Sequence, residues 1–323
     1  MVAALLALSA GCAASGGSNT AGGKRALLTV DFEQGRTIRY RFISDRKIAL
    51  DWDPGARAAA GNVVQQSERL ETVVAYTPTE VDAFGISVVR AKIESVAAAR
   101  SGGPNRRNTA GDAVEAAQGK SFTIKVDPRG KIVDRSELES LIQEMGKNAF
   151  RADTSRGRIK EPDMIGDFIA GQCFLWDAVS TVEAPAGGVA VGQTWQSKLP
   201  VPTPMVMRKA RDVTYRLDEI RQTDAGRIAV IKSTYALAAA APSDWPIPYS
   251  GRFQVSGTFG FLSSYDVSRL EGSGDEQFNI DAGRVESRTE KYAVEMSASL
   301  PPMGIRANPQ IRIDQTLTIE LQR

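Results

Sequence analysis

The chain has 323 residues, of which 42% are hydrophobic and 24% are charged, and its formal net charge is +2. These values are close to the average of globular proteins and exclude wholesale disorder. The balanced charge gives no basis for a nucleic-acid partner, which a strong basic bias normally marks. The length suffices for one large domain or two ordinary ones, with a sizeable core that needs no disulfide bonds.

The N-terminus, MVAALLALSAGC, consists of an apolar run, three small residues and Cys12. This order is typical of a secretory signal peptide, and the apolar run is too short to cross a bilayer. A signal that ends in cysteine resembles the lipobox of bacterial lipoproteins, which are cut before the cysteine and acylated on it. The resemblance implies a signal peptide over residues 1–11 and a lipid on Cys12. Two features depart from that pattern, because Ser9 stands where leucine is usual and no basic residue precedes the apolar run.

Residues 12–24 are rich in Gly, Ser and Ala, which is the composition of a flexible tether. We therefore expect a membrane-anchored lipoprotein of the cell envelope that faces the periplasm or the exterior, with the membrane as its partner through Cys12. If Cys12 is not acylated, we expect a secreted protein. Acylation of Cys12 leaves Cys173 without an internal disulfide partner, and we interpret Cys173 as a small buried hydrophobic residue.

Residues 25–135 are expected to form the first β-rich half. Gly35–Phe42 alternates apolar and polar residues, which indicates a strand with one buried face. Further strands are expected at residues 72–76, 85–96 and 121–126. Asp127-Pro128-Arg129-Gly130 fits a type I turn, because Asp, Pro and Gly are favoured at its first, second and fourth positions. The loop therefore has a structural explanation, and a return strand follows it.

Residues 136–182 are expected to form a helical connector between the halves. Ser136 and Glu139 match a capping box, in which the serine would be the N-cap of the first helix. A second helix is expected from Asp163 to about Val179. Apolar residues nearly encircle this second helix, which indicates that it is buried.

Residues 183–323 are expected to form a second β-rich half, packed with the first as one unit. Its predicted strands lie at residues 212–220, 228–237, 251–261, 276–280, 285–299 and 311–321. The last strand alternates cleanly, which is typical of an antiparallel sheet with one wet face. The sequence therefore predicts a mainly-β, α+β fold of antiparallel sheets.

The two halves share an order of motifs. Gly35-Arg36-Thr37-Ile38 resembles Gly192-Gln193-Thr194-Trp195. The bend from Asp127 to Gly130 corresponds to Asp281-Ala282-Gly283 in the second half. We interpret Asp127, Gly130, Asp281 and Gly283 as structural turn residues. Motifs that repeat in one order at such long separation favour duplication of a β-meander, although β-meanders in general share turn residues.

A family resemblance rests on these motifs. They are the strand hairpin FTIKVDPRGKIV, the segment VAVGQTW, and the late run FNIDAGRV followed by YAVEM. Together they resemble a family of secreted bacterial proteins and lipoproteins that is defined only as a domain of unknown function. The resemblance would extend from Leu28 to Arg323 and implies no established activity.

The chain has no histidine, which leaves few candidate catalytic or metal-binding residues. Its absence excludes histidine-based nucleophile triads and mixed Cys/His zinc sites. Ser44-Asp45-Arg46-Lys47 formally matches a Ser/Lys acyl-enzyme pattern, but the pair would lie at the end of a strand and not on a helix. Asp51 and Asp53 are too few for a calcium loop. We therefore expect no catalytic residue, metal or cofactor.

Three functions remain open. The first is a non-enzymatic binding or structural role in the envelope, including a lipid or lipoprotein carrier in which an apolar concave sheet face holds an acyl chain. The second is a hydrolase of envelope glycans that would use two converging carboxylates. The third is a scaffold that docks on another envelope protein.

Overall fold

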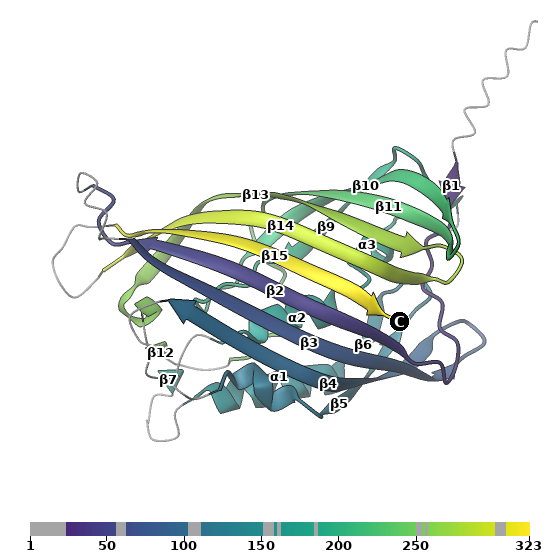
Figure 1. Ribbon diagram of the computed structural model, residues 1–323, viewed down its shortest axis with the longest axis horizontal. Helices are drawn as coiled ribbons and strands as arrows, with labels where there is room; N and C mark the ends of the chain where they lie inside the picture. Colours follow the sequence, from purple (N-terminus) through teal and green to yellow (C-terminus); the bar gives the residue numbers. More distant parts are fainter. Residues whose placement is uncertain are drawn as a thin grey trace, which may run out of the picture.

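Figure 1 shows the computed structural model of the chain, which describes residues 24–55, 63–102, 111–150, 158–159, 163–183, 187–249, 254–255, 258–300 and 308–323. The fold is mainly β. Its dominant feature is an 11-stranded antiparallel sheet. In chain order the strands of this sheet are β2 (Ile38–Asp51), β3 (Val63–Val81), β4 (Ser87–Gly102), β5 (Ser121–Val126), β6 (Ile132–Asp134), β9 (Thr194–Pro200), β10 (Ala210–Thr223), β11 (Gly226–Leu237), β13 (Ser263–Asn279), β14 (Arg284–Ser299) and β15 (Gln310–Gln322).

The two chain halves meet in the middle of this sheet. The spatial order is β6-β5-β4-β3-β2-β15-β14-β13-β11-β10-β9. The first long strand, β2, pairs along its length with the last strand, β15, from Asp51 opposite Gln310 to Arg39 opposite Gln322. Each half is a meander of neighbouring strands, so the pairing of β2 with β15 makes one continuous sheet from both.

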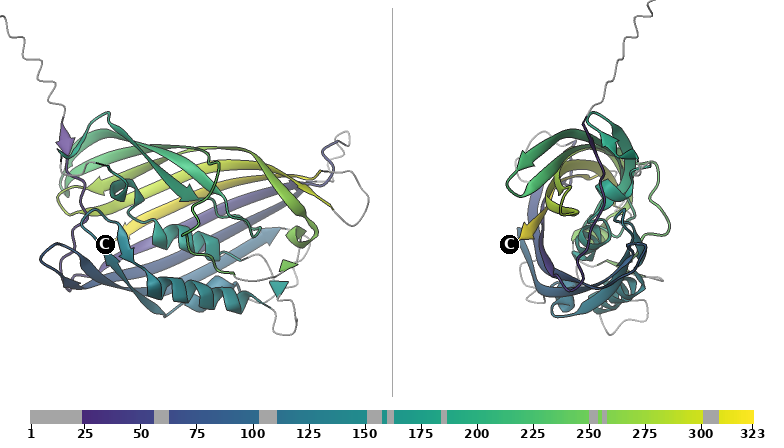
Figure 2. Two further views of the ribbon diagram at one scale, coloured as in Figure 1. Left: turned by 180° about the vertical axis from the view of Figure 1, so that it is seen from behind. Right: turned by 90° about the vertical axis from the view of Figure 1, so that its right-hand side faces the viewer.

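The sheet is strongly curved, and the helices lie on its concave side (Figure 2). They are α1 (Ser136–Ala149), α2 (Ile165–Cys173) and α3 (Asp177–Ser180), with a short 3-10 turn, η1 (Ala113–Ala117), ahead of β5. Two small pairings lie outside the large sheet: β1 (Arg25–Ala26) with β8 (Val189–Ala190), and β7 (Arg158–Ile159) with β12 (Gln254–Val255). A second 3-10 turn, η3 (Thr258–Phe261), precedes β13.

Alternation along the strands produces the two faces. In β2, side chains from Tyr40 to Leu50 at even positions are buried, while the intervening ones are exposed or half-buried. The convex face carries exposed ion pairs between neighbouring strands, such as Arg69 of β3 with Asp45 of β2 and Arg312 of β15 with Glu295 of β14. The predicted period-two pattern is thus confirmed, with the buried face turned to the helices.

The helical segment differs from its prediction in two places. Ser136 is the first residue of α1 and does not cap it; its hydroxyl and backbone N–H both donate to Asp134. The expected second helix is divided into α2 and α3, with a break at residues 174–176. There the Arg288 guanidinium donates to the carbonyl oxygen of Phe174 at 2.7 Å and to that of Leu175 at 3.4 Å. Carbonyl groups at a helix end need such donors, and a buried arginine supplies them here.

Two glycine turns hold one N-terminal segment, residues 28–32, across an end of the curved sheet (Figure 2, right). The turn from Asp127 to Gly130 closes with a 2.8 Å hydrogen bond, and Gly130 has φ +83°. Gly283, at φ +58°, lies in the turn between β13 and β14. The backbone of Val30 donates to Pro128, and that of Asp31 donates to Gly283. A Cβ at Gly130 would lie 2.8 Å from Val30, and one at Gly283 would lie 2.4 Å from the Asp31 nitrogen, so both turns need glycine.

The strand predictions fall short at β3, where residues 72–76 were expected, at β9, which was not predicted, and at β13. Residues 276–280 were expected there, whereas the strand begins at Ser263. The predicted strand at 251–261 lies partly outside the described residues, and the described part contains β12 and η3. Strands β5, β10, β11, β14 and β15 lie within two or three residues of their predicted bounds.

Candidate functional site

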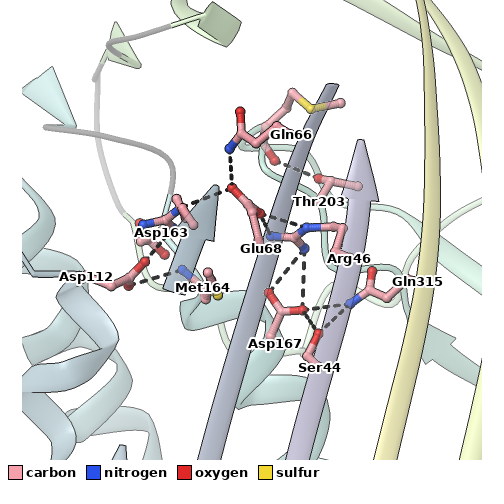
Figure 3. Close-up of polar contacts among 12 residues, drawn as sticks. Ser44, Arg46, Gln66, Glu68, Asp112, Asp163, Met164, Asp167, Thr203 and Gln315 are labelled. Atoms are coloured by element: carbon pink, nitrogen blue, oxygen red, sulfur yellow. Dashed lines mark hydrogen bonds and ion pairs between the residues drawn. The ribbon is translucent and has the colours of Figure 1, made fainter. Parts of the chain in front are cut away.

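Charged side chains are buried on the concave face, between the sheet and α2. Arg46 of β2 pairs with Glu68 of β3 and with Asp167 of α2, at 3.2 Å for the latter. Asp167 also accepts from the hydroxyl of Ser44 at 2.6 Å and from the amide of Gln315 at 2.7 Å (Figure 3). We call these five residues the Arg46 cluster. They fix the position of α2 on the sheet, because a buried charge is tolerated only with its partners.

The cluster extends toward the first turn of α2. Glu68 also accepts from Arg100 at 3.0 Å, and Arg100 pairs with Asp112. Asp112 in turn accepts from the backbone N–H of Met164 at 3.2 Å (Figure 3). Burial alone would raise the pKa of Glu68, but the charges of Arg46 and Arg100 outweigh it and lower that pKa below its ordinary value.

A second group of buried charges lies beneath β13 and β14. Arg288 donates to Glu290 at 2.7 Å and approaches Glu276 at 3.7 Å. Glu290 also pairs with Arg211. The guanidinium carbon of Arg211 lies 4.1 Å from the ring centre of Tyr292 and 4.5 Å from that of Tyr235. Stacking between two rings compensates for Nε and Nη1 of Arg211, which have no hydrogen-bond partner among the described residues. We call these residues the Arg288 cluster.

The concave face is therefore not an open apolar surface. Its centre holds the two charged clusters, and α2 covers it. A small cavity of about 30 Å³ remains between them, lined by Ser44, Asp167, Gln172, Arg288 and other residues. That volume is enough for about one water molecule, and the lining supplies the polar partners that a water needs. The expected acyl chain along the sheet has no room there.

Glu276 provides a test of this interior. Burial, reinforced by Glu290 and Asp177 and opposed by Arg288, raises the pKa of Glu276 to about 7. A raised carboxyl pKa means that the folded state binds the proton more tightly, so its stability falls as pH rises from about 4.5 to above 7, by about 3 kcal/mol from this group. We expect Glu276→Gln to flatten that slope in urea titrations at several pH values.

The control is Glu271→Gln on the same strand, because the Glu271 side chain is 59% exposed. It should leave the pH slope of the free energy of unfolding unchanged. If the free energy of unfolding changes with pH equally in Glu276→Gln and in the unsubstituted protein, the pKa of Glu276 is not raised by burial.

A larger cavity lies beside α2. Its volume is about 330 Å³. Three parts of the chain form its walls: residues 163–174, which include α2, the segment 200–209 between β9 and β10, and the segment 241–249 after β11. We call it the α2 pocket. Its apolar lining residues are Ile169, Phe174, Val201, Met205, Val206, Met207, Trp245, Ile247 and five prolines at 200, 202, 204, 246 and 248.

Contacts between lining residues hold the walls of the α2 pocket in place. The guanidinium of Arg208 donates to the backbone carbonyls of Ser243 at 3.0 Å and Trp245 at 2.8 Å, which joins the two segments. The rings of Trp245 and Phe174 meet edge to face at 5.2 Å. Prolines fix φ, so these walls lose little conformational entropy on binding. The rim exposes two apolar side chains, Val206 at 42% and Ile247 at 43%.

The residues singled out from sequence lie apart from this pocket. Cys12 is outside the described residues. Asp127 and Gly130 form the turn described above. Asp281 lies in the turn between β13 and β14 and accepts a 2.6 Å hydrogen bond from Arg227 of β11.

Ser44 is buried and Lys47 is exposed on the opposite face of β2, so the two side chains of the Ser/Lys pattern cannot act together. Asp51 accepts only from the backbone of Asp53 among the described residues. Cys173 lies at the end of α2, and burial raises the pKa of its thiol to about 12.

The buried charges were missed although a signal for them exists. The apolar face of β2, read as every second residue, passes through Ser44 and Arg46 between Phe42 and Ile48. A polar pair inside an apolar alternation marks a buried polar site. The α2 pocket has no such signal, because its walls come from segments that are distant in sequence.

None of the described helices has the length and apolar character needed to cross a membrane. Among the residues that the structure describes, no group of three or more His, Cys, Asp or Glu side chains is placed to hold a metal ion.

Comparisons with known proteins add little to this description. No protein-family model matches the chain, and no curated protein matches it. A solved structure described as "Lipid-protein interactions in lipovitellin" is similar, with a TM-score of 0.46 and 11% sequence identity. The match covers 91% of this chain and 26% of that chain, so this chain spans about a quarter of its length. At this TM-score the likeness supports no conclusion about ligand or activity.

Proposed function

We propose that the protein is a non-enzymatic binding protein of the cell envelope that holds an apolar ligand, such as an acyl chain, in the α2 pocket. The pocket itself carries the proposal. Its volume of about 330 Å³ falls within the range of ligand sites, and it has an apolar wall with few polar groups. It is about twice the roughly 150 Å³ of an engineered apolar cavity that binds benzene. It would therefore hold on the order of a dozen non-hydrogen atoms.

The lining favours binding over two-carboxylate hydrolysis. Hydrolysis of that kind needs two acids that face one cleft. Asp163 is the one acid among the described residues that line the α2 pocket. Among the described residues, the other buried acids are engaged by Arg46, Arg100, Arg211 and Arg288, apart from Asp177, which accepts from the hydroxyls of Ser197 and Tyr215.

A rim substitution tests the pocket. We expect Val206→Asp to weaken binding of an apolar probe about tenfold, because a carboxylate in the wall must lose water when the ligand enters. Stability should change little, since Val206 is 42% exposed. Decanol binding, followed by calorimetry and by tryptophan fluorescence, gives the readout, because Trp245 lies in the wall.

The matched control is Val191→Asp, because Val191 is 38% exposed and lies just after β8, outside the lining of the α2 pocket. Its affinity for decanol should equal that of the unsubstituted chain. If neither the unsubstituted chain nor Val191→Asp binds decanol, the pocket is not a ligand site.

The anchor is a separate part of the proposal. We expect the mature chain to begin at an acylated Cys12, which would hold the binding body near the membrane through the tether of residues 12–24. Mass spectrometry of the mature N-terminus decides this. An unmodified Ala13 or an intact Met1 would refute the anchor without touching the pocket.

A further inference from the structure

Asp163 stands out in the wall of the α2 pocket. It precedes the first turn of α2, and one of its carboxylate oxygens accepts from the backbone N–H of Ile165 at 2.9 Å. The other oxygen has no hydrogen-bond partner among the described residues. Since Asp163 lines the cavity, that oxygen is available to a ligand.

The charges around Asp163 favour a cation. Asp112 and Asp167 lie near it and carry the same charge (Figure 3), and the nearby Arg100 carries the opposite charge. Arg100 is already engaged by Glu68 and Asp112. Burial first, and then the Asp112 charge, raise the pKa of Asp163 to about 7. The surroundings therefore destabilise the ionised carboxylate, and a bound cation would stabilise it.

The basic residues of the pocket lie on another wall. Arg208 uses its guanidinium on backbone carbonyls of the segment 241–249, as described above. Lys209 is half-buried just before β10 and also lines the pocket. An anionic head group would bind Lys209 and would leave the second carboxylate oxygen of Asp163 without a hydrogen-bond donor.

We propose that the α2 pocket selects apolar ligands with a cationic, hydrogen-bond-donating head, an ammonium group, which binds the free carboxylate oxygen of Asp163. The apolar chain then lies between the two proline-rich segments. This inference rests on the proposed function and adds the head-group class to it. The aromatic rings of Phe174 and Trp245 in the same lining also suit a cation, because their faces carry negative charge density.

The experiment compares three probes of equal chain length. Decylamine, decanol and decanoic acid are titrated by calorimetry into the full-length Cys12→Ser protein, below the concentrations at which the probes aggregate. We expect decylamine to bind about tenfold more tightly than decanoic acid near pH 8.5, where Asp163 is ionised. Decylamine binding should weaken about tenfold at pH 6, because a carboxyl with a pKa of about 7 is then mostly protonated.

Asp163→Asn should remove both the head-group preference and the pH dependence, while decanol affinity stays within about threefold. Asp244→Asn is the control, because Asp244 is an exposed acid in the segment 241–249 that does not line the pocket. If Asp163→Asn does not fold, the pH dependence of decylamine binding to the unsubstituted protein still tests the role of Asp163.

The outcomes separate the two proposals. Failure of all three probes to bind overturns the proposed function and the head-group inference with it. Equal binding of all three leaves the pocket as an apolar site and overturns only the selection by Asp163. Tighter binding of decanoic acid overturns that selection too and assigns the head group to Lys209.

Discussion

Replacing Arg46 by methionine is expected to lower the free energy of unfolding by about 3–5 kcal/mol. The Arg46 and Asp167 side chains are 1% and 2% exposed, and that of Glu68 is 1% exposed. The substitution therefore leaves two buried carboxylates without their main counter-charge. Removing one partner of a buried ion pair costs more than the pair itself contributes, because the remaining charge stays out of water.

Urea unfolding midpoints measure this effect, and Arg312→Met is the control. Arg312 pairs with Glu295 and Asp314 on the convex face, where its side chain is 52% exposed. Exposed pairs contribute about 0–1 kcal/mol. Equal losses from the two variants would contradict the burial of the Arg46 cluster.

A combined variant tests the reason for the loss. Adding Glu68→Gln and Asp167→Asn to Arg46→Met should restore part of the stability, because no buried charge is then left unpaired. If the combined variant is less stable than Arg46→Met alone, the loss came from packing and not from the unpaired charges.

Gly146→Ala is expected to displace a wall of the α2 pocket. A Cβ at Gly146 of α1 would lie 1.7 Å from the carbonyl oxygen of Pro248, which is backbone and has no flexible side chain to move aside. The segment 241–249 must shift away from α1. We expect a stability loss of about 1–3 kcal/mol. We also expect at least tenfold weaker decanol binding, because a wall that moves by an ångström no longer matches the ligand.

Gly166→Ala is the matched control on α2, in the opposite wall. Its Cβ would lie 3.7 Å from Pro202, an ordinary contact, so the methyl group fits. Alanine favours a helix over glycine by about 1 kcal/mol, and stability should stay equal or rise. Decanol affinity should remain within about threefold. If Gly146→Ala binds as Gly166→Ala does, the segment 241–249 is not part of the site.

The sequence predicted most strands because their alternation is local. Strand β5 has the predicted bounds of Ser121–Val126, since apolar residues on its buried face alternate there with polar residues on its other face. Strand β13 was mostly missed because Gly272 and Gly274 interrupt its pattern. A Cβ at Gly272 would lie 2.5 Å from Tyr292, and one at Gly274 would lie 2.2 Å from the Tyr235 hydroxyl. These glycines make room for the rings that enclose Arg211, which is a tertiary requirement.

The Asp-Gly turns show the same limit. That Asp127 to Gly130 is a turn could be read from its residue types alone. The contacts of Gly130 and Gly283 with neighbouring residues of one N-terminal segment could not be read, because Val30 and Asp31 lie far away in sequence. Duplication of the two halves stays a prediction.

The mainly-β fold, its antiparallel strands and the helical segment between them could be predicted from the sequence, because side-chain alternation, turn residues and helical spacing act over a few positions. The pairing of β2 with β15, the meeting of charged residues from both halves beneath α2, and the enclosure of the α2 pocket by three separated segments arise only when the chain folds. Those features depend on which surfaces, distant in sequence, pack against each other and exclude water. Such packing leaves no pattern among neighbouring residues of the sequence.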